Sequence, residues 1–400
     1  MAVRGLTSVD AAIAAAHRSD WARIVAGLIR LTGDWSLAED ATQDAFAAAF
    51  VRWPHDGIPD RPAAWLTTVA RNRAIDRLRS AKTEQSRLRE VSMDLESTES
   101  HDVDDDRLRL IFTCCHPALP LAARVALTLR TVAGLQLAEI ARAFLVPETT
   151  MAQRLTRARR KIEHAGIPYR VPPAELLEER LNGVLAVLYL AFNAGYSDVT
   201  LADLADSAVS LAESLVDLMP LESEASGLLA LVLFQNSRRN ARLNSAGELL
   251  TIEEQDRSLW NHAEIHRGRV ALASARGRGP YVLQASIAEC HAIAPSAEAT
   301  DWSRIVELYD ELLAMSPSPV IALNRAIAVG MRDGPEAGLA LLDGVALELP
   351  GFHLMPAAQA DLLRRAGRID DAVARYRQAI PLAPTAEERA QLQRRLDDLA

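Results

Sequence analysis

The sequence has few cysteines, no long apolar run and no glycine-rich phosphate-binding motif, and each absence excludes a class of protein. Its 400 residues include only three cysteines, too few for a disulfide scaffold and in keeping with a reducing compartment. No apolar run approaches the roughly 18 residues of a membrane span, and the first residues show no signal-peptide core. The 19 glycines form neither G-x-x-x-x-G-K-S/T nor G-x-G-x-x-G, which argues against phosphate-cradling enzymology. We therefore expect a cytoplasmic protein with no membrane association.

The charge is unevenly distributed. A net charge of −9 argues, taken alone, against a partner made of nucleic acid. Residues 1–170 nevertheless hold 24 basic and 21 acidic side chains, against 20 and 32 in residues 171–400. Basic residues outnumber acidic ones by seven to two in 71–89 and by six to one in 142–161, whereas 90–106 carries eight acids and no Lys or Arg. This pattern indicates two segments suited to nucleic acid, joined by a solvated acidic linker.

The chain reads as helical almost throughout. Ala, Leu, Arg and Glu dominate, and runs that alternate with period two are scarce, which predicts an all-α fold. Ser36 and Glu39 have the spacing of a capping box, which would open a helix that ends near Trp53. Phe46, Phe50 and Trp53 are expected to mark its buried stripe. A second helix is expected over residues 63–88, after a loop with three prolines.

The last hundred residues repeat weakly. Tyr309-x7-Pro317, Leu341-x8-Pro350 and Tyr376-x7-Pro384 place their prolines 33 and 34 residues apart. A period near 34 residues, closed by proline, is typical of tetratricopeptide (TPR) helix pairs. Another array of helix pairs is the alternative.

Residues 137–162 have the spacing of a helix-turn-helix. A short helix is broken at Val146-Pro147, and a second begins at Glu148 with one apolar stripe of Met151, Leu155, Ala158 and Ile162. At 100° per residue, Gln153, Arg157 and Arg160 lie on the opposite face. Arg can pair with guanine and Gln with adenine, so this face suits a reader of the major groove. The alternative is a solvated basic face on a core helix.

The first basic window has no single stripe. Arg73 and Arg77 share one face of the expected helix, whereas Arg71 and Arg79 lie on others. Together with Asn72 and nearby Trp65, they suit contacts to a nucleic-acid backbone and stacking on an unpaired base. An ordinary surface helix is the alternative.

Two of these segments resemble known domains. Ala38–Phe46 (AEDATQDAF), followed by Trp65–Leu66 and by Arg71–Arg79 (RNRAIDRLR), resembles domain two of the extracytoplasmic-function (ECF) sigma factors of the sigma-70 family. Residues 137–162, with Arg157-Ala158-Arg159, resemble their domain four. The rest resembles the subgroup with a long, TPR-like helical C-terminal extension, through four stretches: Phe112–Pro117 (FTCCHP), Leu190–Tyr196 (LAFNAGY), Glu253–Trp260 (EEQDRSLW) and Leu362–Arg368 (LLRRAGR).

The resemblance implies a domain plan and an activity. It implies an all-α protein with a domain-two helical bundle, a domain-four helix-turn-helix and a TPR-like array. The expected bounds are 1–89, a linker over 90–106, 107–168, and an extension over 173–400 whose repeats are clearest at about 300–400. The implied function is that of an alternative sigma factor that binds RNA polymerase core and directs promoter-specific initiation. No catalytic residue, metal site or cofactor is expected.

The resemblance also assigns three sets of residues. Asp40, Gln43 and Asp44 match the contact with the β′ clamp of polymerase core, which also includes the β subunit. Recognition of the −10 element is expected from Trp65, Arg71, Asn72, Arg73, Arg77 and Arg79. Recognition of the −35 element is expected from Thr150, Ala152, Gln153, Arg154 and Arg157. Ala152 is shorter than the polar residue that many members carry there, so one base contact is expected to be apolar or missing.

Two other functions remain open at this point. One is a one-component transcription regulator with a helix-turn-helix and a TPR-type sensor, which has no use for Asp40, Gln43 and Asp44. The other is a TPR scaffold that has lost DNA binding, which predicts a degraded recognition face. The acidic extension is expected to face protein, and a protein partner or regulator would bind its helical array.

Overall fold

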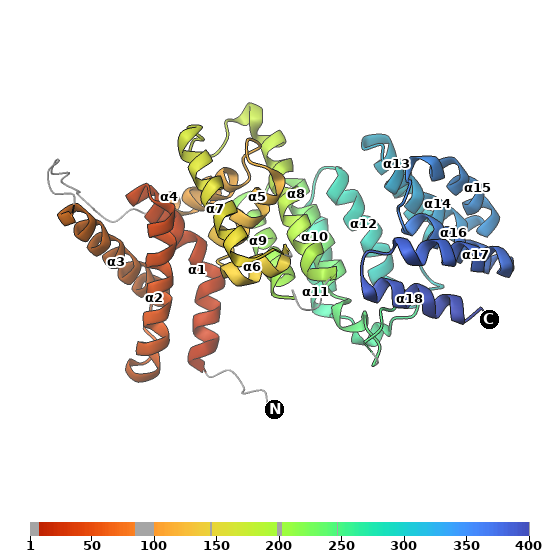
Figure 1. The fold of residues 1–400 in the computed structure, drawn as a ribbon, viewed down its shortest axis with the longest axis horizontal. Coiled ribbons are helices and arrows are strands. Elements are labelled where there is room, and N and C mark those ends of the chain that lie inside the picture. Colours follow the sequence, from red (N-terminus) through yellow and green to blue (C-terminus); the bar gives the residue numbers. More distant parts are fainter. Residues whose placement is uncertain (1–7, 85–99, 145, 198–201, 246, 400) are drawn as a thin grey trace. The chain divides into compact units, whose positions relative to one another are not determined.

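The computed structural model describes residues 8–84, 100–144, 146–197, 202–245 and 247–399 (Figure 1). These residues form helices, and the one pairing of extended backbone is an isolated bridge between Leu243 and Leu249. The predicted all-α class is therefore confirmed. The chain divides after Leu218 into two compact units. None of the described helices combines the length and the apolar character needed to cross a membrane.

The first unit contains both segments that are predicted to bind nucleic acid. Its helices are α1 (Ser8–Thr32), α2 (Trp35–Asp56), α3 (Pro62–Glu84), α4 (Ser100–Cys114), α5 (Leu121–Leu127), the π-helical turn η1 (Thr128–Val132), α6 (Leu137–Ala143), α7 (Glu148–His164), α8 (Ala174–Ser197) and α9 (Ala202–Leu218). The first three helices pack on one another (Figure 1).

Helix α2 begins before the predicted capping box. Its N-cap is Asp34, whose Oδ1 accepts a hydrogen bond from the Leu37 amide at 3.0 Å. The prediction that Ser36 caps the helix is wrong, because the aspartate two residues earlier satisfies the free amide. Glu39 therefore does not take part in capping this helix. The helix ends at Gly57, whose φ of 86° is readily adopted by glycine.

The buried face of α2 is centred on alanines rather than on aromatic rings. Ala38, Ala45 and Ala49 are fully buried. Phe46 and Trp53 are buried at the edge of this face, as predicted, but Phe50 is 55% exposed. The expectation for Phe50 is wrong because alanines allow close helix approach, which moves the centre of the contact away from the larger side chains.

The last residues assigned to the acidic linker are helical. Residues 85–99 lie outside the described part, and α4 begins at Ser100, before the predicted boundary at 106. Asp106, assigned to the solvated linker, is instead buried. It pairs with Arg30 of α1 at 2.7 Å and with Arg109 at 3.2 Å, and these cations compensate for its loss of water.

The helix-turn-helix forms as predicted. In α7, Met151, Leu155, Ala158 and Ile162 are all buried. In α6, Ile140 and Ala141 are buried, whereas Phe144, which was expected to face inward, is only half-buried. The loop before α6 requires glycine at position 134, because φ is 75° and a Cβ there would lie 2.7 Å from the His17 ring.

The first two helices of the extension belong to the first unit. Helix α8 packs on α4 and α5, and Arg180 donates to the Phe112 carbonyl oxygen at 2.7 Å. The predicted break between 168 and 173 does coincide with the loop between α7 and α8. The compact unit nevertheless continues to Leu218.

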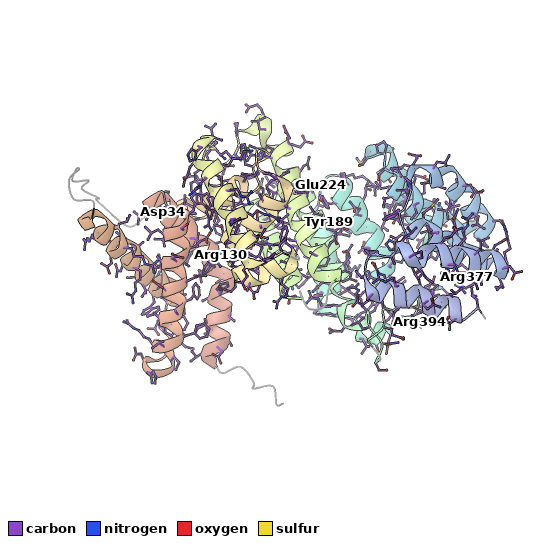
Figure 2. All side chains as sticks on the ribbon, in the orientation of Figure 1. Asp34, Arg130, Tyr189, Glu224, Arg377 and Arg394 are labelled. Atoms are coloured by element: carbon purple, nitrogen blue, oxygen red, sulfur yellow. The ribbon has the colours of Figure 1, made fainter. Side chains whose placement is uncertain are left out.

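The second unit is a succession of helices in which each packs on its neighbour in sequence. They are α10 (Ser223–Asn236), α11 (His262–Ser274), α12 (Pro280–Ile293), α13 (Trp302–Met315), α14 (Pro319–Asp333), α15 (Pro335–Val345), α16 (Leu354–Arg365), α17 (Ile369–Ala379) and α18 (Ala386–Asp397). Arg394 of α18 (Figure 2) ties this helix to the segment before α11 through Glu248 and Glu254. The assignment of these pairs to the TPR type stays a prediction.

Candidate nucleic-acid and polymerase interfaces

The outer face of α7 carries the predicted −35 residues. Gln153 and Arg157 are exposed, and Arg157 Nε donates to the Gln153 carbonyl oxygen at 3.3 Å. Arg154 is half-buried, with its guanidinium 5.4 Å from the centroid of the Phe144 ring. Thr150 and Ala152 are also half-buried. Gln153 and Arg157 are therefore the members of this set with the freest access to a base edge.

The predicted −10 residues are all on α3, but they differ in exposure. Asn72, Arg73, Arg77 and Arg79 are exposed, whereas Arg71 is half-buried. Trp65 is half-buried with its ring edge-on to Trp53 at a centroid distance of 5.7 Å. Trp65 is thus supported by the buried Trp53 ring, and its own accessible part is suited to stack on an unpaired base.

The three predicted polymerase-binding residues are divided between two environments. Asp40 and Asp44 remain about half exposed and both pair with Arg77, at 3.5 and 2.8 Å. Gln43 faces Arg130; in the amide orientation that satisfies both groups, the side-chain oxygen of Gln43 accepts a hydrogen bond from Arg130 Nη2 at 3.0 Å. Arg77, a predicted −10 residue, therefore partly neutralises the charges of Asp40 and Asp44, two predicted polymerase contacts.

An open hollow adjoins Asp44. It measures about 440 Å³ and lies between α2 and α3. Val51, on its wall, is 68% exposed. The hollow is lined by Asp44, Ala47, Ala48, Val51, Arg52 and Arg73. The hollow therefore combines exposed apolar side chains with one carboxylate and two guanidinium groups, and such an apolar patch with a polar border suits a protein contact.

Glu39 of α2 was not predicted as a site residue, yet its carboxylate accepts several hydrogen bonds. Glu39 is buried, and its carboxylate accepts hydrogen bonds from Arg130 Nε at 3.1 Å and from Thr131 Oγ1 at 2.8 Å. Arg159 Nη2 lies 2.7 Å from both of its oxygens. Arg130 is on η1 and Arg159 is on α7 (Arg130 is labelled in Figure 2). We call these four residues the Glu39 cluster.

The sequence contained a signal for Glu39. At 100° per residue it lies about 20° from Phe46, on the apolar side of α2. A carboxylate among buried alanines requires cationic partners. The signal was overlooked because the spacing from Ser36 offered a capping role instead.

The side chains around the cluster are buried. Burial raises the pKa of the Cys114 thiol well above its usual range, and the charges of Cys115 and Glu39 raise it further. Burial, followed by hydrogen bonding from Thr128 in the opposite direction, leaves the pKa of Cys115 at about 11. Both thiols therefore stay protonated at neutral pH. Within the described ranges, no three His, Cys, Asp or Glu side chains gather as a metal site would require.

Comparisons with known proteins identify both halves of the first unit. Sigma-70 region 2 matches residues 16–84, and Sigma-70, region 4 matches residues 109–162. A family of unknown function (DUF6596) matches residues 180–276. No solved structure matches the chain.

Three relatives share different lengths of this sequence. An uncharacterized protein of Rhizobium meliloti is 42% identical over 390 residues, which cover 93% of this chain and 92% of that protein. The probable ECF RNA polymerase sigma factor SigI of Mycobacterium tuberculosis is 31% identical over 171 residues, 41% of this chain and 58% of SigI. The ECF RNA polymerase sigma factor SigL of the same species is 41% identical over 85 residues, 20% of this chain and 46% of SigL.

Regions 2 and 4 in this order define an RNA polymerase sigma factor, a class of non-catalytic initiation factors. The chain belongs to the ECF sigma factors of the sigma-70 family, as an alternative sigma factor with a C-terminal extension of unknown role. The predicted membership of the ECF sigma factors is therefore confirmed, whereas the assigned site residues stay predictions. A one-component regulator would not need region 2, so that alternative is set aside.

Proposed function

We propose that this sigma factor docks on polymerase core through the exposed side of α2. The partly exposed carboxylates of Asp40 and Asp44, with exposed Val51 on the same helix, would suit a basic helical pair such as the β′ clamp. Arg77 would leave the two aspartates when the clamp takes its place. The β subunit completes the core that the chain joins.

We further propose that α3 and α7 read the two promoter elements. Exposed arginines and the half-buried Trp65 support −10 recognition by α3, where an opened duplex presents unpaired bases. The exposed Gln153 and Arg157, above a fully buried stripe, support −35 recognition by α7. This exposed recognition face is the single observation that most favours promoter reading over a scaffold.

The extension is proposed to act on protein rather than on DNA. Residues 171–400 carry 20 basic and 32 acidic side chains, so DNA repels this part of the chain. A protein partner or regulator on the helical array would fit its charge. The chain is proposed to work in the cytoplasm, beside polymerase and promoter DNA, with no catalytic activity or cofactor of its own.

A promoter-library selection tests the proposed reading surfaces. Polymerase core carrying the full chain is used to select bound sequences, in parallel with the variants Arg157→Ala and Arg377→Ala. Arg377 lies on α17 (Figure 2) and is exposed like Arg157, so its replacement controls for the loss of one cation. Arg157→Ala should relax one position of the −35 element, with a loss of about 1–3 kcal/mol, while Arg377→Ala leaves the consensus unchanged. Identical consensus sequences for all three proteins would refute the assignment of α7.

A further inference from the structure

A hollow in the second unit adjoins the motif Glu253–Trp260 (EEQDRSLW), to which the proposed function gives no role. The end of this motif forms the 3-10 turn η4 (Arg257–Leu259) and Trp260. With it, α11 and the end of α12, which pack on one another (Figure 1), enclose about 350 Å³. The lining consists of Arg257, Trp260, His262, Ile265, His266, Arg269, Ala292, Ile293, Ala294 and Pro295. The volume falls within the range of small-molecule sites, which is about 300–1,000 Å³.

The lining of the hollow departs from the charge of the rest of the extension. Residues 171–400 carry 20 basic and 32 acidic side chains, yet the lining includes two arginines, two histidines and no Asp or Glu. Arg269 pairs with Glu289 of α12 at 3.1 Å, so Arg257 is the arginine of the lining that keeps its charge for another partner. An apolar wall with a cationic group suits a ligand that has an apolar body and a negative head group.

Arg257 is held in place without being neutralised. Its Nη1 donates to the carbonyl oxygens of His291 at 2.7 Å and Ala294 at 2.9 Å, at the C-terminal end of α12. Its guanidinium carbon lies 4.3 Å from the centroid of the Trp260 ring. Within the described part of the chain, Arg257 forms no ion pair, and its Nε and Nη2 have no hydrogen-bond partner. Two donors of an immobilised cation therefore stay available to an anion, at little further cost in side-chain entropy.

The electrostatic environment of Arg257 is positive. Burial lowers the pKa of Arg257, and the charge of Arg238 lowers it further, against a smaller opposite effect of Glu298. Burial also lowers the pKa of nearby His291, and the charges of Arg238 and Arg257 act in the same direction. At both residues the neighbouring arginines thus disfavour a positive charge, and an anion in the hollow would offset this field.

Trp260 adds a buried donor that lacks a partner. The residue is 4% exposed, and its Nε1 has no hydrogen-bond partner among the residues that the structure describes. Arg238 also lies over this ring, at 6.0 Å from its centroid. Because buried polar groups are nearly always hydrogen-bonded, this N–H favours a ligand that brings an acceptor. The surroundings of the hollow therefore offer several donors and little negative charge.

We propose that this hollow binds a small organic anion, namely an apolar body that carries a carboxylate or a phosphate group. Arg257 holds the anionic group through Nε and Nη2, and Trp260 and Ile293 contact the apolar body. His262 and His266, one turn apart on α11, border the site. The extension would thus take a small ligand in addition to its proposed protein partner. Binding of this ligand requires neither polymerase core nor promoter DNA.

Isothermal titration calorimetry on the full chain tests the site. The probes are phenylacetate, phenyl phosphate and 2-phenylethanol, which is close in shape to phenylacetate but uncharged. At millimolar concentration at least one of the two anions should bind and the alcohol should not, because only an anion pairs with Arg257. The affinity should fall as salt is added, since salt screens the charge pair. The anion that binds more tightly identifies the head group.

Three variants locate the binding. Arg257→Gln removes the cation and should weaken binding of the anion by about tenfold or more. Ile293→Glu places a carboxylate in the lining, at a position that is 53% exposed, and should abolish binding by repelling the anion. Val270→Glu is the matched control, because Val270 is 58% exposed on α11 but does not line the hollow. This control should bind as the native chain does, and circular dichroism shows whether each variant retains its helices.

Each contrary result overturns the proposal. Absence of binding of both anions to the native chain does so, as does binding of 2-phenylethanol with equal affinity. Native affinity in Ile293→Glu, or in Arg257→Gln with intact helices, would show that the anion binds elsewhere. An equal loss in Ile293→Glu and Val270→Glu would show a general charge effect rather than a site. If Arg257→Gln loses its helices, the comparison of Ile293→Glu with Val270→Glu decides. Since no polymerase is present, none of these results bears on the proposed function.

Discussion

The crossing of α14 and α15 allows the same substitution to have opposite effects at two glycines of one helix. Gly338 and Gly344 both lie on α15. A Cβ at Gly338 would lie 2.8 Å from the Ala326 carbonyl oxygen and 2.8 Å from the Gly330 Cα, whereas a Cβ at Gly344 would meet nothing within 4 Å. Since the atoms near Gly338 belong to the backbone of α14, the two helices must move apart to admit a methyl group.

The magnitudes follow from that geometry. Replacing glycine by alanine inside a helix gains about 0.5–1 kcal/mol, and overpacking costs about 1–3 kcal/mol. Gly338→Ala should therefore lower the free energy of unfolding of the second unit by about 1–2 kcal/mol, and Gly344→Ala should raise it by about 0.5 kcal/mol. Urea unfolding, followed by helical circular dichroism, measures both. A Gly338→Ala protein as stable as Gly344→Ala would refute the close approach of α14 and α15.

Three further predictions concern binding and pH. Arg71→Ala should weaken promoter binding by the holoenzyme similarly on all sequences and reduce the slope of log affinity against log salt by about 1, measured by a salt titration. Asp44→Ala should weaken binding of polymerase core about tenfold, while Asp60→Ala, its exposed control, should bind as the native chain does in a fluorescence titration. Burial, followed by the charges of Arg238 and Arg257, lowers the pKa of His291 from 6.5 to about 4. Between these two pH values the unfolded chain therefore binds more protons than the folded chain. The stability that is present above pH 6.5 is consequently lost as the pH falls toward 4. His291→Gln should flatten this loss, which amounts to at most about 3 kcal/mol, and unchanged pH dependence of unfolding would contradict the assignment.

The helix-turn-helix was predictable because its signals are local. The apolar stripe of α7 repeats at helical spacing, and Val146-Pro147 breaks the chain before it. Both the buried set and the exposed Gln153 and Arg157 follow from that periodicity. The two sigma regions were predictable from motifs for the same reason.

The contacts between regions were not predictable from such patterns. Glu39 and Arg159 are 120 residues apart, and each has an alternative role in its own helix. The same applies to Asp106, which belongs to an acidic run by composition but is buried through Arg30 of α1. Helical periodicity assigns a face to each residue, but it does not identify which distant helix covers that face.

The first aromatic stripe shows a different limit. Phe46, Phe50 and Trp53 were all assigned to the buried face of α2 because their spacing is i, i+4, i+7. The structure instead centres the contact on alanines, so Phe50 is exposed. Where alanines dominate a helix, side-chain size is a poor guide to the buried face, because close packing favours the small residues.

Core-dependent initiation tests the central claim, that the chain is an alternative sigma factor, most directly. Purified polymerase core is incubated with a library of promoter fragments, with and without the full chain, and the 5′ ends of the transcripts are sequenced. The account predicts transcripts that require the chain, start at a fixed distance from shared −10 and −35 elements, and are lost when Asp44 and Arg157 are both replaced by alanine. Transcripts that are the same with and without the chain, together with no binding of the chain to core, would contradict it.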